Sequence, residues 1–156
     1  MRTGPVGFVR GMSGTGTAVL AVALVLTAAA AWWLRTRDGA VRTVPEAAGD
    51  GSPVFARLGA RPAEAELTVV QFSTAFCGPC RATKARLQQL QATRPGLAVV
   101  QVDAESHLGE VRELDVRRTP TLFYLDREGR LVGRSSGAPA PAELTALVDA
   151  HVGVRS

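Results

Sequence analysis

The stretch QFSTAFCGPCRATKARL, residues 71–87, holds both cysteines of this 156-residue chain, Cys77 and Cys80. Only Gly78 and Pro79 separate the two thiols. A disulfide between them closes too short a loop to stabilise the fold much by restricting the unfolded chain. The spacing therefore favours a pair of thiols with a chemical role over a structural disulfide.

The cysteines lie at the junction between a predicted strand and a predicted helix. Residues 67–72 (LTVVQF) are mostly apolar and partly β-branched, which is typical of a central strand buried on both faces. The helix is expected to begin at the cysteines and to run towards Thr93, because Pro95 and Gly96 follow as stop signals.

A thiol at the start of a helix meets unpaired backbone N–H groups and the positive end of the helix dipole, which lower its pKa. Cys77 is therefore the predicted nucleophile, and Cys80, one turn into the helix, is the predicted resolving thiol. Pro79 suits an early helical position because its missing N–H would be unpaired there anyway. Arg81 adds a positive charge nearby.

The rest of the C-terminal part alternates between strand and helix patterns. We predict a possible short strand at 53–58, a strand at 97–103, a short helix at 108–116, strands at 121–126 and 130–136, and a helix at 141–152. A β-α-β unit followed by two adjacent strands and a final helix predicts a compact α/β domain over residues 53–156, with a mixed central sheet flanked by helices.

The N-terminal part predicts a membrane segment. Residues 17–34 (TAVLAVALVLTAAAAWWL) carry no charge and end on two tryptophans, which arginines follow at once. About 20 such residues span a bilayer, and tryptophans are typical of its interface. We therefore expect an N-terminal tail at 1–16, a transmembrane anchor at 17–34 and a flexible linker at 35–52, which is rich in Gly, Pro, Ala and charge.

A signal peptide is the alternative for the same segment, because arginines precede the apolar run and the small residues 28–30 could suit a peptidase. We favour the anchor because the run continues past those residues. We expect the protein to lie in the cell membrane with a single span, and the N-terminal helix to contact membrane lipid. The arginines on the two sides of the apolar run do not decide which side of the membrane carries the domain. If translation started at Met12, the arginines before the run would be lost, and the positive-inside rule would place the domain in the cytoplasm.

Two segments resemble the thioredoxin family. FCGPCR, residues 76–81, is similar to that family's active-site sequence, with Phe76 where a tryptophan is usual. RTPTLFYLDREGRLVGRSSG, residues 118–137, resembles its second signature. The two motifs have the expected separation, 40 residues from Cys80 to Pro120, and the similarity covers about residues 53–152.

The resemblance implies a thioredoxin-like fold in which the bond before Pro120 is cis and packs beside the disulfide. It also implies a substrate-binding surface around the cysteines, formed by Phe76, Gly78, Pro79, Thr119 and Pro120. Plain packing is the alternative for Phe76, and a simple turn is the alternative for Thr119 and Pro120.

The sequence predicts no metal and no organic cofactor. Two cysteines could form half of a zinc site, but four ligands are normally needed, and only His107 and His151 remain, without the spacing of a zinc finger. The net charge is +4 from 18 basic and 14 acidic residues. That small excess does not form the basic patch of a nucleic-acid binder, so we expect no nucleic-acid partner.

The predicted function is that of a membrane-tethered thiol–disulfide oxidoreductase. Reduced Cys77 attacks a disulfide of a protein substrate, Cys80 resolves the mixed disulfide, and an upstream thiol reductant restores the dithiol. The alternatives are a tethered interaction module that keeps the fold without redox turnover, and a dithiol oxidase or isomerase.

One departure from the family pattern concerns the strand before the cysteines. Typical members bury an Asp there, near a Lys of the neighbouring strand, whereas this chain has Gln71 and, less securely aligned, Gln101. We expect the two amides to hydrogen-bond to each other beneath Cys80, in a site where a lone buried charge would be costly. An amide cannot act as a base at neutral pH, so Cys80 would lack one.

Overall fold

The computed structural model describes residues 14–37, 41–43 and 53–153. The chain divides into two compact units, residues 1–36 and 37–156, which are described separately. The predicted tail up to residue 13 and most of the predicted linker lie outside the described residues.

The first unit contains helix α1 (Gly14–Arg37), which covers the predicted apolar span. Its apolar side chains are exposed, among them Leu24 and Val25. Nevertheless, no helix within the described part of the chain has the length and hydropathy to cross a bilayer. The predicted transmembrane anchor is therefore not supported.

The second unit is built on a five-stranded mixed sheet with the strand order β1-β5-β4-β2-β3. Strands β2 and β3 are parallel, and the other neighbours are antiparallel, which confirms the predicted mixed sheet. The strands are β1 (Val41–Thr43), β2 (Leu67–Ser73), β3 (Leu97–Asp103), β4 (Thr121–Asp126) and β5 (Leu131–Ser136).

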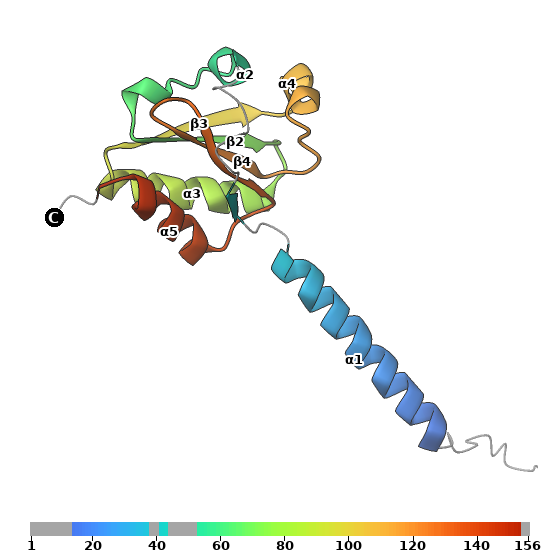
Figure 1. The fold of residues 1–156 in the computed structure, drawn as a ribbon. Helices are drawn as coiled ribbons and strands as arrows, with labels where there is room; N and C mark the ends of the chain where they lie inside the picture. The colour runs from blue at the N-terminus through green and yellow to red at the C-terminus, as the bar shows by residue number, and fades with distance from the viewer. Residues whose placement is uncertain (1–13, 38–40, 44–52, 154–156) are drawn as a thin grey trace, which may run out of the picture. The chain divides into compact units, whose positions relative to one another are not determined.

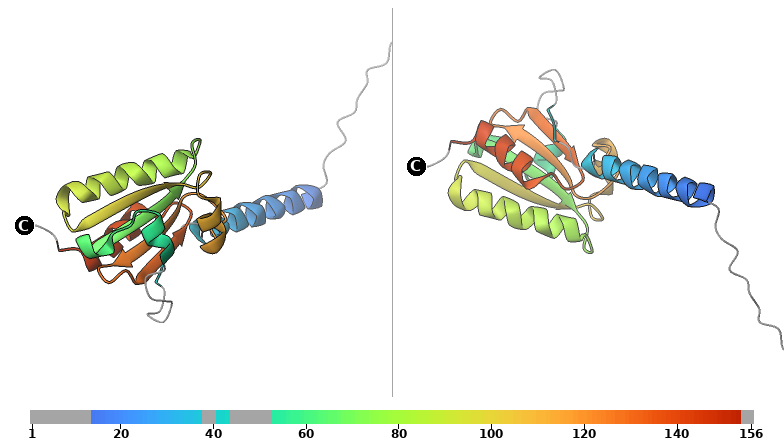
Figure 2. Two further views of the ribbon diagram at one scale, coloured as in Figure 1. Left: turned by 90° about the horizontal axis from the view of Figure 1, so that it is seen from above. Right: turned by 90° about the horizontal axis from the view of Figure 1, so that it is seen from below.

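Helices cover both faces of this sheet, as Figures 1 and 2 show. One face packs against α3 (Gly78–Thr93) and α5 (Pro141–His151), and the other against α2 (Pro53–Arg57) and α4 (Leu108–Glu113), while a 3-10 helix, η1 (Pro62–Glu64), precedes β2. Residues alternate between the faces along β2. Val69 packs in the core under α3 and α5, whereas Val70 packs in the opposite core.

Residues 53–58, predicted as a possible strand, instead form helix α2 and the turn after it. In a strand, Val54 and Phe55 would point to opposite faces. Here both are buried in the same core, and Leu58, one turn later, joins them. The short helix α4 also ends three residues before its predicted end, where Asp115 adopts a positive φ of 49° that a helix cannot continue.

Strand β1 is absent from the sequence predictions and lies within the segment expected to be a linker. It pairs antiparallel with β5, with Val41 opposite Ser135 and Thr43 opposite Gly133. An edge strand is recruited through the unpaired backbone groups of its neighbour. Three residues that add to an edge in this way need no long apolar pattern, so the sequence gives little signal for them.

Candidate active site at the start of helix α3

The turn between β2 and α3 places the two cysteines. Cys77 is the N-cap residue of α3, and its Sγ accepts a hydrogen bond from the backbone N–H of Cys80 at 3.2 Å. Its own N–H donates to the carbonyl of Thr74. A disulfide joins Cys77 to Cys80, with 5.2 Å between their Cα atoms. The helix therefore begins at the cysteines, as predicted.

The two sulfur-bearing residues differ in their access to solvent. Cys80 is only 3% exposed, whereas Cys77 is partly exposed at the protein surface. Phe76, directly before it, is 96% exposed, and Gly78 and Pro79 are exposed as well. The plain-packing alternative for Phe76 is therefore wrong. An incoming disulfide would meet Cys77 with an aromatic ring beside it.

A second loop lies against the cysteine turn. The Thr119–Pro120 bond is cis, as the resemblance implies, and Pro120 is buried. The hydroxyl of Thr119 lies 3.5 Å from the hydroxyl of Thr74, the residue whose carbonyl accepts the N–H of Cys77. This contact brings together the two motifs that are 40 residues apart in the sequence. Whether these residues bind a substrate stays a prediction.

Thr74 has no part in the sequence predictions, although it connects both loops. Its position three residues before Cys77 is the only sequence signal for it. That signal is weak, because a threonine in a turn after a strand is common and its partner, Thr119, is distant along the chain. Only the folded structure shows the contact between the two hydroxyls.

Beneath the disulfide, a buried amide connects the sheet to α3. Gln71 is fully buried, and its Nε2 donates to the carbonyl oxygen of Cys80 at 3.0 Å. Its Oε1 accepts from Nε2 of Gln101 at 3.3 Å, and the two residues are paired in the register of β2 and β3. The expected amide pair beneath Cys80 is confirmed. Gln71 uses its N–H donor on the helix backbone and offers the thiol no base.

The two histidines contact backbone carbonyls rather than the cysteines. Nδ1 of His107 lies 3.0 Å from the carbonyl of Asp103, and Nδ1 of His151 lies 2.9 Å from that of Leu147. Within the described ranges, no group of three or more His, Cys, Asp or Glu side chains is placed to hold a metal ion. The half-site formed by the cysteines thus gains no further ligands from the residues described.

Comparison with known proteins agrees with this geometry. Residues 60–150 match the family model for thioredoxin. The chain belongs to the thioredoxin family. This thioredoxin-family chain is 29% identical over 89 residues to thioredoxin H4-1 of Oryza sativa subsp. japonica, covering 55% of this chain and 67% of that protein. It is 31% identical over 78 residues to thioredoxin H4-2 of the same plant, covering 50% of this chain and 58% of that protein.

Solved structures show the same fold. The crystal structure of Fasciola hepatica thioredoxin superposes with a TM-score of 0.51 and 27% identity, covering 57% of this chain and 84% of that one. The family and the Cys77–Cys80 disulfide together support a thiol–disulfide oxidoreductase. They confirm the family resemblance that the two motifs carried, and they leave the direction of the reaction and its substrates to be proposed.

Proposed function

We propose that this protein reduces disulfide bonds of protein substrates through the Cys77–Cys80 dithiol. The carrying observation is the unequal placement of the two cysteines: Cys77 is partly exposed at the N-cap of a 16-residue helix, and Cys80 is buried behind it. A thiol pair with one accessible and one sheltered member suits successive attack on a partner and then on the mixed disulfide. Thioredoxin family membership supports protein disulfides as substrates and a thiol reductant as the electron source.

The reaction runs in two exchanges. The thiolate of reduced Cys77 attacks one sulfur of the substrate disulfide, so that a Cys77–substrate bond forms and the other substrate sulfur leaves with the electron pair and takes up a proton. Cys80 then loses its proton and attacks Sγ of Cys77. The intramolecular disulfide seen here forms, and the second substrate sulfur leaves as a thiolate. Two electrons have passed to the substrate, and an external thiol reductant must return them.

The residues around the disulfide assist these steps. The N–H of Cys80 already points at Sγ of Cys77, so a thiolate formed there gains a charge-assisted hydrogen bond. We assign substrate contact to exposed Phe76, Gly78 and Pro79 and to the loop at Thr119 and Pro120, which the Thr74–Thr119 contact holds against the cysteine turn. The assignment rests on family resemblance and on exposure.

Two serine variants of the full chain test this function. With a model protein disulfide and a thiol reductant, the parent should reduce the substrate faster than the reductant alone, and Cys77→Ser should abolish that gain. Cys80→Ser should instead stop after the first exchange and accumulate a mixed disulfide on non-reducing gels. If the parent shows no turnover and Cys77→Ser still binds the partner, the interaction module is favoured. Faster oxidation than reduction of the substrate would favour the oxidase or isomerase.

The cell-membrane location is a second part of the proposal. It is supported by the uncharged run at 17–34 and by the exposed apolar side chains of α1, while no helix among the described residues has both the length and the hydropathy of a membrane span. Cell fractionation should place the parent in the carbonate-washed membrane and Leu24→Arg/Val25→Arg in the soluble fraction. Equal distribution of both would overturn it. A C-terminal reporter active on only one side would identify the side that carries the domain.

A further inference from the structure

We propose that this protein selects partners whose disulfide lies in an acidic surface, and that Arg81 and Lys84 of helix α3 recognise that surface. The inference rests on the proposed function, because it names the chemistry of the partner that meets the same disulfide. It is carried by the distribution of charge along α3 and around the cysteine turn.

The segment that builds the site has no acidic residue. Between Glu66 and Asp103 the chain contains no Asp or Glu, although this stretch includes β2, α3, both cysteines and β3 up to Val102. Four cations lie in it, Arg81, Lys84, Arg86 and Arg94. Strand β2 and helix α3, which present the disulfide, therefore carry positive charge alone.

Two of these four cations hold α3 against α5. Arg94 forms an ion pair with Asp149, and Nη2 of Arg86 donates to the hydroxyl of Thr145 at 2.9 Å. Both partners lie on α5. A structural role therefore accounts for Arg86 and Arg94.

Arg81 and Lys84 have no such role. Both are exposed, and within the portion of the chain that the structure describes neither forms an ion pair. They are three residues apart on a helix, so they share one side of it. They also lie in the first two turns of α3. The first of these turns has no acidic residue. A cation at a helix N-terminus opposes the helix dipole and so does not stabilise the helix. Uncompensated charges in this position favour a binding role over a stabilising one.

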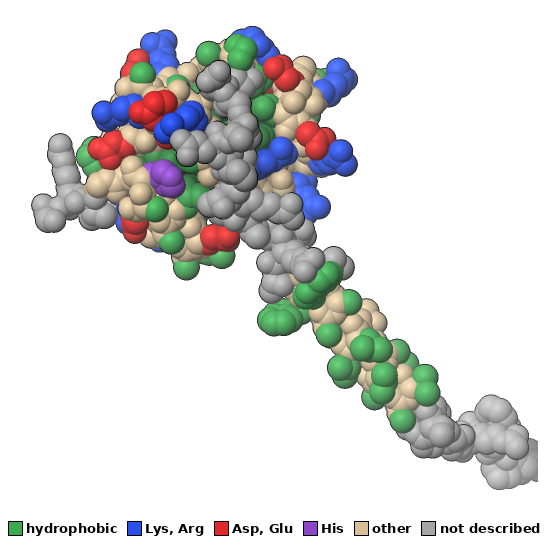
Figure 3. Space-filling view, in the orientation of Figure 1, with side chains coloured by type: hydrophobic (Ala, Val, Ile, Leu, Met, Phe, Trp, Pro, Cys, Tyr) green, Lys and Arg blue, Asp and Glu red, His purple; other side chains and the backbone are tan. Residues whose placement is uncertain are grey.

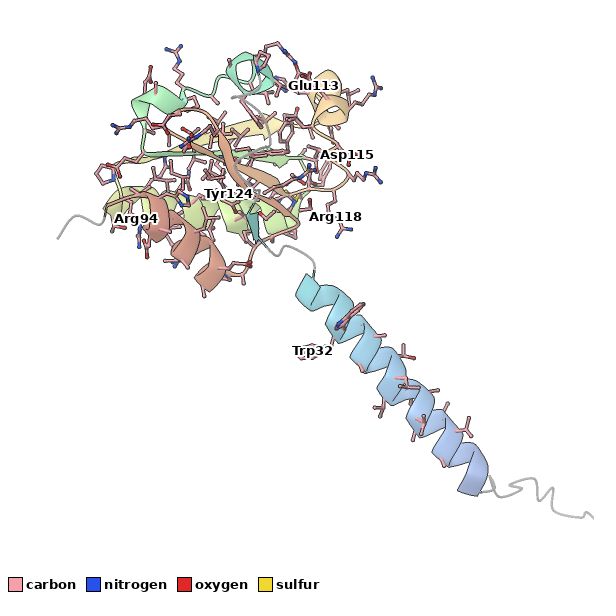
Figure 4. All side chains as sticks on the ribbon, viewed as in Figure 1. Trp32, Arg94, Glu113, Asp115, Arg118 and Tyr124 are labelled. Atoms are coloured by element: carbon pink, nitrogen blue, oxygen red, sulfur yellow. A yellow bond between two sulfur atoms is a disulfide. The ribbon has the colours of Figure 1, made fainter. Side chains whose placement is uncertain are left out.

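A third exposed cation lies across the cysteine turn. Arg118 directly precedes the Thr119–Pro120 loop, which contacts the turn through Thr74, and its side chain extends away from the sheet in Figure 4. The preceding residue, Arg117, forms an ion pair with Asp115, with an N–O distance of 2.8 Å. Along the right-hand edge of the domain in Figure 3, Lys and Arg side chains alternate with Asp and Glu side chains.

Arg81, Lys84 and Arg118 are called the basic rim below. The exposed ring of Phe76 belongs to the residue directly before Cys77 in the cysteine turn. An aromatic centre with a charged border is the usual anatomy of a protein–protein interface. Of the acidic residues at this end of the sheet, Asp103 already accepts hydrogen bonds from the hydroxyl of Ser106 and the N–H of Glu105.

Charges at the border of an interface act mainly on the rate of encounter and on the choice of partner, and salt screens them. The test uses two peptides that contain the same internal disulfide, flanked either by glutamates or by lysines. We expect the parent to reduce the acidic peptide about tenfold faster at low ionic strength, the lower end of electrostatic steering. The preference should shrink at about 0.5 M salt.

Arg81→Gln/Lys84→Gln should bring the ratio of the two rates close to one. The matched control is Arg61→Gln/Arg127→Gln, which removes the same charge from exposed residues at the opposite end of the sheet, where Leu67 pairs with Asp126. This control should keep the parent's ratio. The inference would be overturned, with the proposed function left standing, if the parent reduced both peptides at equal rates. It would also be overturned if the control variant lost the rate preference as fully as Arg81→Gln/Lys84→Gln. Failure of the parent to reduce either peptide would overturn the proposed function, and the inference with it.

Discussion

Nε2 of Gln71 donates a hydrogen bond to the carbonyl oxygen of Cys80 at 3.0 Å and so connects strand β2 to the first turn of α3. A carbonyl oxygen only accepts, so the nitrogen of the amide must face it. The oxygen of the same amide is held by Gln101. The amide nitrogen and oxygen of the fully buried Gln71 side chain therefore both have hydrogen-bond partners, and the first turn of α3 is held at a fixed distance from the sheet.

We predict that Gln71→Glu destabilises the oxidised protein at pH 7 by about 1–3 kcal/mol, because a carboxylate would face the Cys80 carbonyl without a donor. Only a protonated carboxyl can donate there, so folding should raise the pKa of this glutamate above the unfolded value of about 4.3. Its stability deficit should then grow as the pH rises above that value and shrink towards pH 4. Chemical denaturation at several pH values measures it.

The exposed partner position supplies the control for that variant. Gln101→Glu should cost less, because the new carboxylate is solvated. In stopped-flow reduction of a model disulfide, Gln71→Glu should speed the attack by Cys80 near pH 7, since a proton acceptor has been added beneath the resolving thiol. If Gln71→Glu were as stable as the parent and its Cys80 attacked no faster, the Gln71–Cys80 contact would affect neither stability nor the rate of that step.

We predict that reduced Cys77 reacts with alkylating reagents with a midpoint below pH 8.5, the approximate value for a free thiol. The reason is geometric: its Sγ lies at the N-cap of α3 and accepts the N–H of Cys80. The rate of alkylation against pH, measured on the reduced parent and on Cys80→Ser, checks this. A midpoint at or above that of a free thiol, or faster alkylation at Cys80, would reverse the assignment of the nucleophile.

The single tyrosine of the chain provides a prediction at alkaline pH. Burial raises the pKa of Tyr124 to about 12; the hydrogen bond with Ser135 opposes this, and the charge of Glu143 adds to it. A raised pKa means that this contribution to stability is lost as the pH rises from about 10, the unfolded value, through the folded one. Absorbance at 295 nm should therefore show little phenolate in the folded protein at pH 10 and a rise on unfolding.

Tyr124→Phe is the matched variant. It should remove the alkaline loss of stability and cost about 0.5–1.5 kcal/mol at neutral pH, because the hydroxyl of Ser135 loses its partner. Denaturation curves at pH 7 and pH 10.5 separate the two effects. Phenolate absorbance with an ordinary midpoint near pH 10 in the folded parent would contradict the burial argument.

The turn between β4 and β5 provides a prediction at acid pH. Burial works to raise the pKa of Asp126, but hydrogen bonds from the side chain and backbone of Arg130, together with its charge, outweigh that effect and lower the pKa. The stabilisation is therefore present above the unfolded value of about 3.9 and is lost as the pH falls through the folded pKa.

Asp126→Asn should accordingly destabilise the protein at pH 7 by about 1.5–3 kcal/mol, the range for hydrogen bonds to charged groups. The parent and the variant should converge as the pH falls through the folded pKa of Asp126, because the carboxylate is then lost in both states. Glu128→Gln is the control, because its ion pair with Arg130 is largely exposed and should contribute little. A constant difference between parent and variant from pH 7 to pH 2 would exclude the ionised carboxylate as the cause.

The sequence alone determined the central elements and the chemistry of the site. Apolar runs and stop signals gave the bounds of β3, α3 and β4 almost to the residue, because strand and helix periodicities are local properties of the chain. The Cys77–Cys80 spacing predicted a pair of thiols with a chemical role in the same local way, and the second signature added the loop at Pro120 through family resemblance.

The tertiary structure decided which distant residues meet. Residues 53–57 became helix α2 because Val54 and Phe55 enter one core together, and β1 formed because the edge of β5 was open. The exposure of Phe76 and the contact between the Thr74 and Thr119 hydroxyls likewise depend on segments far apart in the chain. A local pattern records how each segment folds, but edge pairing and side-chain contact also depend on what other segments leave open or cover, which is fixed only when the whole domain packs.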